Sequence, residues 1–361
     1  MIKIPQTTYR TIGAGHPVYI IAEVGSNFDG DLERAKMLAR LAKEAGADAY
    51  KIQNFLASKI VSQKGFDGLK LAFQSKWDKP VVEVYKKAEF PREWVKELAK
   101  YCREIGIDFF SSPYDKEAVD LLDEIGVPAF KFGAGEIDNV EFLAYAAKKG
   151  KPMIISCGAC TLEDVQRAVK AVTDAGNNQI ILLQCITNYP SPIADANLKA
   201  MVTLKNMFGF EVGYSDHTTS KAGGGDDPLE GITVPLAAVA LGGVVIEKHF
   251  TDDITRKGPD HPFALPIGTL KKMVDAIRAL EKAMGSGEKK IENSEVETVV
   301  IQRRGIYAKE TIKEGEKISS DRIEFLRPAL FLRPPQAKDI LGRQSKRTIM
   351  AGEPIKLDDL I

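Results

Sequence analysis

Short apolar runs alternate with longer amphipathic segments along most of this chain. The short runs are rich in β-branched residues, and the longer segments repeat their apolar residues at helical spacing. Eight runs of the strand type begin near Val18, Ala49, Asp108, Ala129, Pro152, Gln179, Glu211 and Val244. This alternation is typical of a parallel sheet with crossover helices, and eight such units close a barrel. We therefore predict an α/β fold, a (β/α)8 TIM barrel, over residues 1–285.

Capping residues and glycines mark the ends of the predicted helices. Asp31 and Thr161 each precede a helix whose first turn is acidic, where the helix dipole favours negative charge. The predicted helices include residues 32–45, 92–105, 161–175 and 269–284. Residues 54–91 are too many for an ordinary connection, so we expect a functional excursion near the barrel mouth. Its aromatic residues Phe73, Trp77 and Tyr85 are expected to pack as part of a lid.

The alternation ends after Gly285, and a different pattern follows. Residues 286–298 are polar and rich in Lys and Glu, which is typical of a linker between domains. In residues 299–361, the segment 312–318 is echoed by 349–355, with glycine turns between short apolar pieces. We predict a second, small β-rich domain there.

Charge and cysteine content narrow the classes of function. Lys+Arg and Asp+Glu are balanced at 50 each, so no broad basic surface for nucleic acid or an anionic membrane is expected. The N-terminal residues lack the apolar core of a secretory signal, and the longest apolar stretch, 232–246, is too short to span a bilayer. The four cysteines suit reduced thiols. A cytoplasmic protein is expected.

Two of only four histidines, His217 and His249, close apolar runs of the strand type. Strand ends of an α/β barrel face the active-site mouth, and neutral imidazole is the commonest protein ligand of a catalytic divalent metal. The pair therefore predicts a metal held over the barrel. Manganese is the expected ion, and magnesium, cobalt and zinc remain alternatives.

Charged and hydroxyl side chains also gather at the predicted strand ends. Lys51 and Lys131 interrupt apolar strands, where a lysine is unfavourable unless it is paired. Together with serines and a metal, two such lysines suit a small ligand that carries both phosphate and carboxylate. The alternative is a purely structural ring of buried ion pairs formed by Lys51, Lys131, Glu23 and Glu136.

The motifs that contain these residues resemble the phosphoenolpyruvate-dependent sialic acid (N-acetylneuraminate) synthases. They are Ile-Ala-Glu-Val-Gly at 21–25, Lys-Ile-Gln at 51–53, Ser-Pro-Tyr-Asp at 112–115, Lys-Phe-Gly-Ala-Gly-Glu at 131–136, Gly-Tyr-Ser-Asp-His-Thr at 213–218, Glu-Lys-His-Phe-Thr at 247–251 and Gly-Pro-Asp-His at 258–261. Residues 304–361 resemble the antifreeze-like (SAF, β-clip) domain that ends those enzymes.

The resemblance implies condensation of phosphoenolpyruvate with an open-chain amino sugar to give a nine-carbon 2-keto sugar acid and phosphate. It implies that His217 and His249 hold a divalent metal that polarises the sugar aldehyde. Phosphoenolpyruvate would be bound by Lys51, Ser112, Lys131, Thr187 or Asn188, and Ser215. The sugar or a metal-bound water would be contacted by Glu23, Gln53, Tyr189 and Asp260. Glu136 would handle a proton during attack of water at the keto carbon.

The resemblance also implies a domain-swapped homodimer, in which Arg327 enters the barrel of the neighbouring subunit. Three departures from the family pattern affect the acceptor site: Phe28, Ala134 and the bulky segment 329–334. The acceptor therefore stays open between N-acetylmannosamine and a related 2,4-diacetamido sugar. The alternatives are another phosphoenolpyruvate-aldose synthase that makes a keto-deoxy sugar acid, and a catalytically inactive sugar-binding homologue.

Overall fold

The computed structural model describes residues 2–4, 10–67, 69 and 79–361. The chain divides into two compact units, Met1–Gly285 and Ser286–Ile361. Each unit is described by itself below. Within the described residues, no helix combines the length and the apolar character needed to cross a membrane.

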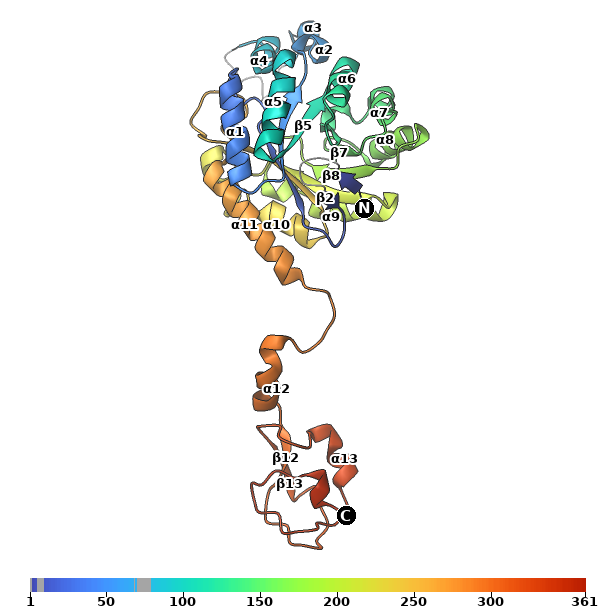
Figure 1. The fold of residues 1–361 in the computed structure, drawn as a ribbon, viewed down its shortest axis with the longest axis vertical. Coiled ribbons are helices and arrows are strands. Elements are labelled where there is room, and N and C mark those ends of the chain that lie inside the picture. Colours follow the sequence, from blue (N-terminus) through green and yellow to red (C-terminus); the bar gives the residue numbers. More distant parts are fainter. Residues whose placement is uncertain (1, 5–9, 68, 70–78) are drawn as a thin grey trace. The chain divides into compact units, whose positions relative to one another are not determined.

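Eight parallel strands form a nearly closed barrel in the first unit (Figure 1). They are β3 (Tyr19–Glu23), β4 (Ala49–Asn54), β5 (Asp108–Pro113), β6 (Phe130–Phe132), β7 (Met153–Cys157), β8 (Ile180–Cys185), β9 (Glu211–Asp216) and β10 (Val245–Thr251). The hydrogen-bonded path runs β5-β4-β3-β10-β9-β8-β7-β6, and β5 and β6 are neighbours at the seam. Each strand begins within one residue of its predicted start. The predicted TIM-barrel fold is confirmed.

Helices cover the outside of the barrel. The main ones are α1 (Leu32–Glu44), α5 (Arg92–Ile105), α6 (Lys116–Glu124), α7 (Val140–Ala147), α8 (Leu162–Asp174), α9 (Leu198–Phe208), α10 (Thr233–Ala240) and α11 (Ile267–Met284). Asp31 caps α1 by accepting hydrogen bonds from the amides of Glu33 and Arg34, and Thr161 forms a capping box with Asp164. Both predicted caps are confirmed.

An apolar floor fills the lower part of the barrel. Alternate residues of a strand share a face, so Val245, Glu247 and His249 all point to the same side of β10. Val245 belongs to a buried cluster with Ile21, Ala49, Phe110 and Leu183, and the next inward positions are polar. The N-terminal hairpin of β1 (Ile2–Ile4) and β2 (Arg10–Ile12) adds Ile2 and Ile12 to this cluster, a feature that was not predicted.

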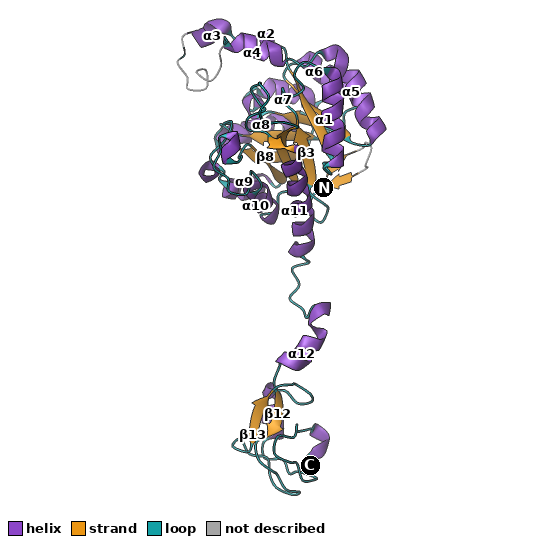
Figure 2. Cartoon of the chain, turned by 90° about the vertical axis from the view of Figure 1, so that its left-hand side faces the viewer, coloured by secondary structure: helices purple, strands orange, loops and turns teal. Residues whose placement is uncertain are grey.

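The long excursion after β4 contains three short helices, α2 (Ala57–Ile60), α3 (Gln63–Asp67) and α4 (Val81–Ala88). Figure 2 shows the three helices together at one end of the barrel. Tyr85 packs edge-on against Phe55, with ring centroids 5.7 Å apart. Phe73 and Trp77, the other two aromatic residues expected in a lid, lie outside the described residues. The strand β11 (Leu265–Pro266) pairs with β10 after the last barrel loop.

The second unit is built around a repeat that pairs with itself. Its elements are α12 (Val296–Gln302), β12 (Gly305–Ala308), β13 (Ile323–Leu326) and α13 (Ala337–Ile340). Ile312 and Ile349, which start the two copies of the repeat, exchange backbone hydrogen bonds of 2.9 and 2.8 Å. Both side chains are fully buried in the core of the unit. The last part of the predicted linker, from Asn293, is helical in the structure.

Candidate active site

A polar cavity lies where the barrel strands end. Eight of the predicted site residues line it: Lys51, Gln53, Ser112, Lys131, Tyr189, Ser215, His217 and His249. The alternation of side chains explains this convergence, because Lys51 and Gln53 share the inner face of β4 as Glu247 and His249 share that of β10. The register places Glu23 beside both Lys51 and His249.

Two buried lysines share one carboxylate at the bottom of this cavity. Lys131 Nζ lies 3.4 Å from Glu247 Oε1, and Lys51 Nζ lies 3.7 Å from Glu247 Oε2. Lys51 also forms a closer ion pair with Glu23. Each of these four side chains is at least nine-tenths buried. The lysines are therefore held in place by carboxylates before any ligand binds.

Hydroxyl groups complete this cluster. Lys51 Nζ donates to Ser112 Oγ at 3.1 Å, and Lys131 Nζ donates to Ser156 Oγ at 2.7 Å. Ser215 Oγ donates to Glu247 Oε1 at 2.9 Å. Burial tends to raise the pKa of Glu247, but the two lysines outweigh it and hold that pKa below its usual value. Glu247 is therefore an ionised counter-ion of both lysines.

The four residues of the buried ion pairs differ in one member from the ring that the sequence suggested. They are Lys51, Lys131, Glu23 and Glu247, and Glu136 is not among them. Glu136 ends the 3-10 turn η2 (Ala134–Glu136) after β6, where burial raises its pKa. Gly133 and Ala134 of the same segment line the cavity, whereas Glu136 lies outside the lining residues.

The two predicted metal ligands lie side by side at the mouth. The His217 and His249 ring centroids are 5.5 Å apart. His217 Nδ1 lies 2.8 Å from the carbonyl oxygen of Ile186, so this nitrogen carries the proton and Nε2 keeps a free lone pair. Burial lowers the pKa of His217 to about 4 and that of His249 well below its usual value. Both rings are therefore neutral, the form that binds metals.

An unpartnered nitrogen supports the fit of a metal at this pair. His249 Nδ1 is buried and has no hydrogen-bond partner in the part of the chain that the structure describes. A buried polar atom of this kind requires a partner, which a bound ion would supply. No set of three or more metal-ligating His, Cys, Asp or Glu side chains occurs among the described residues. Two histidines would leave most coordination positions open to ligands, as catalytic sites require.

Aromatic rings form one wall beside the histidines. The Tyr189 ring centroid lies 4.2 Å from that of His217, and Phe263 lies 5.1 Å from His249. Tyr189 keeps 41% of its surface exposed, so its free face borders the cavity. This wall presents apolar surface to whatever occupies the space beside the two histidines.

Asp260 reaches the histidines past a glycine. Its Oδ2 accepts hydrogen bonds from the Ser26 amide at 2.7 Å and from Ser26 Oγ at 2.8 Å. A Cβ atom added at Gly25 would overlap this carboxylate and lie 3.2 Å from the His249 ring. Gly25 also has a φ of +52°, which favours glycine. The close approach of Asp260 to His249 therefore depends on Gly25.

We expect Gly25→Ala to reduce kcat/KM at least tenfold, because the new methyl group displaces Asp260 from His249. The left-handed backbone adds a stability cost of about 1–2 kcal/mol. Gly30→Ala is the matched control, since Gly30 lies in the same loop with a φ of +72° and no atom within 4 Å of an added Cβ. Steady-state kinetics and melting curves of both variants check this, and equal loss of activity in the two would contradict the role of Asp260.

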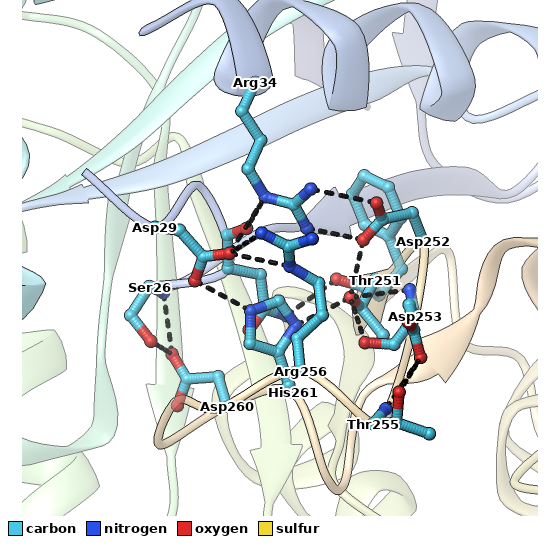
Figure 3. A network of polar contacts seen from close by, with 12 residues as sticks. Ser26, Asp29, Arg34, Thr251, Asp252, Asp253, Thr255, Arg256, Asp260 and His261 are labelled. Carbon is cyan, nitrogen blue, oxygen red and sulfur yellow. Dashed lines mark hydrogen bonds and ion pairs between the residues drawn. The ribbon is translucent and has the colours of Figure 1, made fainter. Parts of the chain in front are cut away.

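A network of ion pairs joins the loop after β3 to the segment after β10 (Figure 3). Asp29 lies 3.2 Å from Arg34, 2.7 Å from Arg256 and 3.0 Å from His261. Arg34 also pairs with Asp252, and His261 Nδ1 lies 2.8 Å from Thr251 Oγ1. This network fixes the loop that carries Ser26 and the segment that carries Asp260.

The remaining predicted residues have different positions. Gln53 Nε2 donates to Glu23 Oε1 at 3.0 Å. Thr187 and Asn188 are exposed after β8 and lie outside the lining residues. Arg327 is exposed at the end of β13 in the second unit. Six lining residues were missing from the predicted set: Tyr114, Gly133, Ala134, Ser156, Cys185 and Glu247. Strand alternation could have found Glu247, which lies two residues before His249.

Comparison with known proteins identifies the family. The model of the NeuB family matches residues 38–289, and that of the SAF domain matches residues 303–361. This chain belongs to the NeuB family. The resemblance inferred from the sequence motifs is therefore confirmed, and the β-rich second unit contains a SAF domain. The NeuB match covers the strands that carry the lysine cluster and both histidines.

Several relatives of this NeuB-family chain are named as synthases of sialic-acid-type sugars. It is 39% identical to the N,N'-diacetyllegionaminic acid synthase of Campylobacter jejuni, over 93% of this chain and 98% of that protein. It is 36% identical to human N-acetylneuraminate-9-phosphate synthase, over 87% of this chain and 84% of that protein. The crystal structure of a sialic acid synthetase from Leptospira borgpetersenii in complex with citrate aligns with a TM-score of 0.69 and 33% identity. The alignment covers 81% of this chain and 93% of that one. The chain is thus placed within a family of enzymes.

Proposed function

We propose that this NeuB-family enzyme condenses phosphoenolpyruvate with an amino sugar to give a nine-carbon 2-keto sugar acid and phosphate. The observation that carries the proposal is the Lys51–Glu247–Lys131 cluster, which lies below the histidine pair in one cavity. Relatives that match over most of this chain are named as synthases of legionaminic, pseudaminic and sialic acids. N-acetylmannosamine and 2,4-diacetamido sugars are the proposed acceptors.

The lysine cluster is the proposed binding site of phosphoenolpyruvate. Its phosphate and carboxylate would accept charge-assisted hydrogen bonds from Lys51 and Lys131 and neutral ones from Ser112, Ser156 and Ser215. Thr187 and Asn188 stand at the rim after β8, where they would meet the ligand only if their loop closed over it. The ion pairs with Glu23 and Glu247 keep the lysines oriented in the free enzyme.

His217 and His249 are the proposed ligands of a divalent metal, with manganese as the first choice and magnesium or cobalt as alternatives. When bound, such a metal polarises the aldehyde of the acceptor. Gln53, Glu23, Tyr189 and Asp260 surround this position and would orient the open-chain sugar. Carbon 3 of phosphoenolpyruvate then forms a bond to the aldehyde carbon, and the aldehyde oxygen takes up a proton.

Glu136 is the proposed base for the second step. Water adds to carbon 2 and gives up a proton, and phosphate leaves as the 2-keto group forms. Burial raises the pKa of Glu136, which suits a carboxylate that accepts a proton. Because Glu136 lies outside the lining residues of the free enzyme, its turn would have to move toward the bound substrate.

Dimerisation and location are part of the same proposal. We propose a domain-swapped homodimer in which Arg327 of one subunit contacts the sugar in the barrel of the other. Exposure of Arg327 after β13 supports an intermolecular role for its guanidinium. A cytoplasmic location is supported by the four free cysteines, three of which are buried.

A substrate panel tests the proposed reaction. Phosphate release would be followed with phosphoenolpyruvate and N-acetylmannosamine, 2,4-diacetamido sugars or their phosphates, with and without added metal. We expect release only when both an aldose and a divalent metal are present. Shorter phosphorylated aldoses are added for comparison. Release with these alone would favour a synthase of a keto-deoxy sugar phosphate, and no release with any aldose would favour an inactive sugar-binding protein.

We expect Lys51→Met and Lys131→Met to raise the KM for phosphoenolpyruvate about tenfold to a hundredfold, because each removes a charge-assisted contact. The KM for the aldose should change less. Lys170→Met is the matched control, since Lys170 is an exposed residue of α8 that pairs with Asp174. A lysine variant that folds and keeps the phosphoenolpyruvate KM and kcat of the control would remove that lysine from the binding site.

A further inference from the structure

A second and larger cavity, of about 540 Å³, lies between α4 and the segment after β10. This size is sufficient for a small-molecule ligand. Val84 and Ala88 of α4 supply apolar surface, and Ser26, Lys87, Arg256 and Lys257 supply polar groups. We refer to this space as the outer cavity. It is lined by none of the residues that surround the lysine cluster.

Asp260 separates the outer cavity from the histidine pair. On one side, its Oδ2 accepts both hydrogen bonds from Ser26, which lines the outer cavity. On the other side, the carboxylate and the His249 ring both approach the empty Cβ position of Gly25. Asp260 is therefore the residue that a sugar with its aldehyde end at the histidines would have to pass to reach Ser26 and the outer cavity.

The outer cavity carries an excess of positive charge. Its lining includes four cationic side chains and two carboxylates. Asp29 is already paired with Arg256, Arg34 and His261, as Figure 3 shows, and Glu83 lies 4.0 Å from Lys79. Lys87 and Lys257 form no ion pair with any residue that the structure describes. These two ammonium groups are available to an anionic ligand.

We propose that the outer cavity binds an anionic group, a phosphate or carboxylate, at the far end of the acceptor sugar. This inference rests on the proposed function, because it takes the aldehyde end of the acceptor to lie at His217 and His249. Lys87 and Lys257 contact the anion, while Val84 and Ala88 pack against the carbon chain. The acceptor class is therefore an amino sugar with a charged terminus, such as a 6-phosphate.

Kinetics with a charged and an uncharged acceptor test this proposal. The ratio of kcat/KM for N-acetylmannosamine 6-phosphate to that for N-acetylmannosamine should exceed ten in the wild type. Lys257→Met and Lys87→Met should each lower this ratio at least fivefold, and the preference should weaken as salt is added. Lys86→Met is the matched control, because Lys86 is the adjacent exposed residue of α4 and pairs with Glu89 at 2.8 Å.

The outcomes separate this inference from the reaction itself. Suppose that both acceptors give phosphate release, that the ratio of their kcat/KM values is near one, and that Lys257→Met leaves this ratio unchanged. This result would overturn the proposed role of the outer cavity and leave the proposed function standing. Calorimetric titration of the full-length protein with N-acetylmannosamine 6-phosphate tests anion binding in the outer cavity even if no turnover occurs. Weaker binding in Lys257→Met than in Lys86→Met supports the proposal, and equal binding in the two overturns it.

Discussion

His217→Ala and His249→Ala are each expected to reduce kcat by about a thousandfold or more. Loss of a proposed ligand would remove the polarising metal from an open catalytic site, and such polarisation is worth several kcal/mol. Folding should change little, because both side chains face the cavity at the barrel mouth and His249 Nδ1 has no partner in the described chain. Metal content and activity should fall together.

Metal analysis and melting curves check this expectation. Each variant would be stripped with a chelator, reloaded with manganese, and assayed beside the wild type treated in the same way. Lys170→Met, which alters an exposed residue of α8, controls for the handling. Full activity of both histidine variants after chelation and reloading would contradict the metal assignment.

Mixing two inactive variants is expected to restore activity if the dimer is domain-swapped. Arg327→Ala lacks the arginine proposed to orient the sugar, and His217→Ala lacks a proposed metal ligand. In a mixed dimer, the barrel with an intact His217 receives the intact Arg327 of its partner. After complete subunit exchange, about a quarter of the wild-type sites are rebuilt, because half of the dimers are mixed and each has one complete site.

A second mixture provides the control for this experiment. His217→Ala mixed with His249→Ala should stay inactive, because each barrel then lacks one of its own metal ligands. Subunit exchange would be measured with differently tagged chains. Absence of recovery in the first mixture, with exchange demonstrated, would mean that Arg327 serves its own barrel or none.

The barrel could be predicted closely because its signals are local. The β-branched runs and the caps Asp31 and Thr161 depend on neighbouring residues alone, and the structure confirms them. The self-pairing of Ile312 and Ile349 follows in the same way from a visible repeat. The N-terminal hairpin escaped notice because the burial of Ile2 and Ile12 depends on a barrel floor formed by distant strands.

The sequence predicted which residues gather at the candidate site better than it predicted which of them pair with each other. The sequence indicated Lys51, Lys131, His217 and His249 by their places at strand ends, and the cavity brings them together. The alternative of a structural ring placed Glu136 where the structure has Glu247. Which carboxylate reaches a lysine depends on strand register, which the sequence does not show. The outer cavity could not be predicted, because α4 and the segment after β10 that line it are far apart in the chain.

Analysis of the carbon product tests the central claim most directly. The enzyme would be incubated with manganese, phosphoenolpyruvate labelled with carbon-13 at carbon 3, and an acceptor from the panel. The proposed reaction predicts a nine-carbon 2-keto sugar acid in which the label is bonded to the former aldehyde carbon, with one phosphate released for each product molecule. Phosphate release with the label recovered only in pyruvate would contradict carbon–carbon bond formation and the account built on the lysine and histidine site.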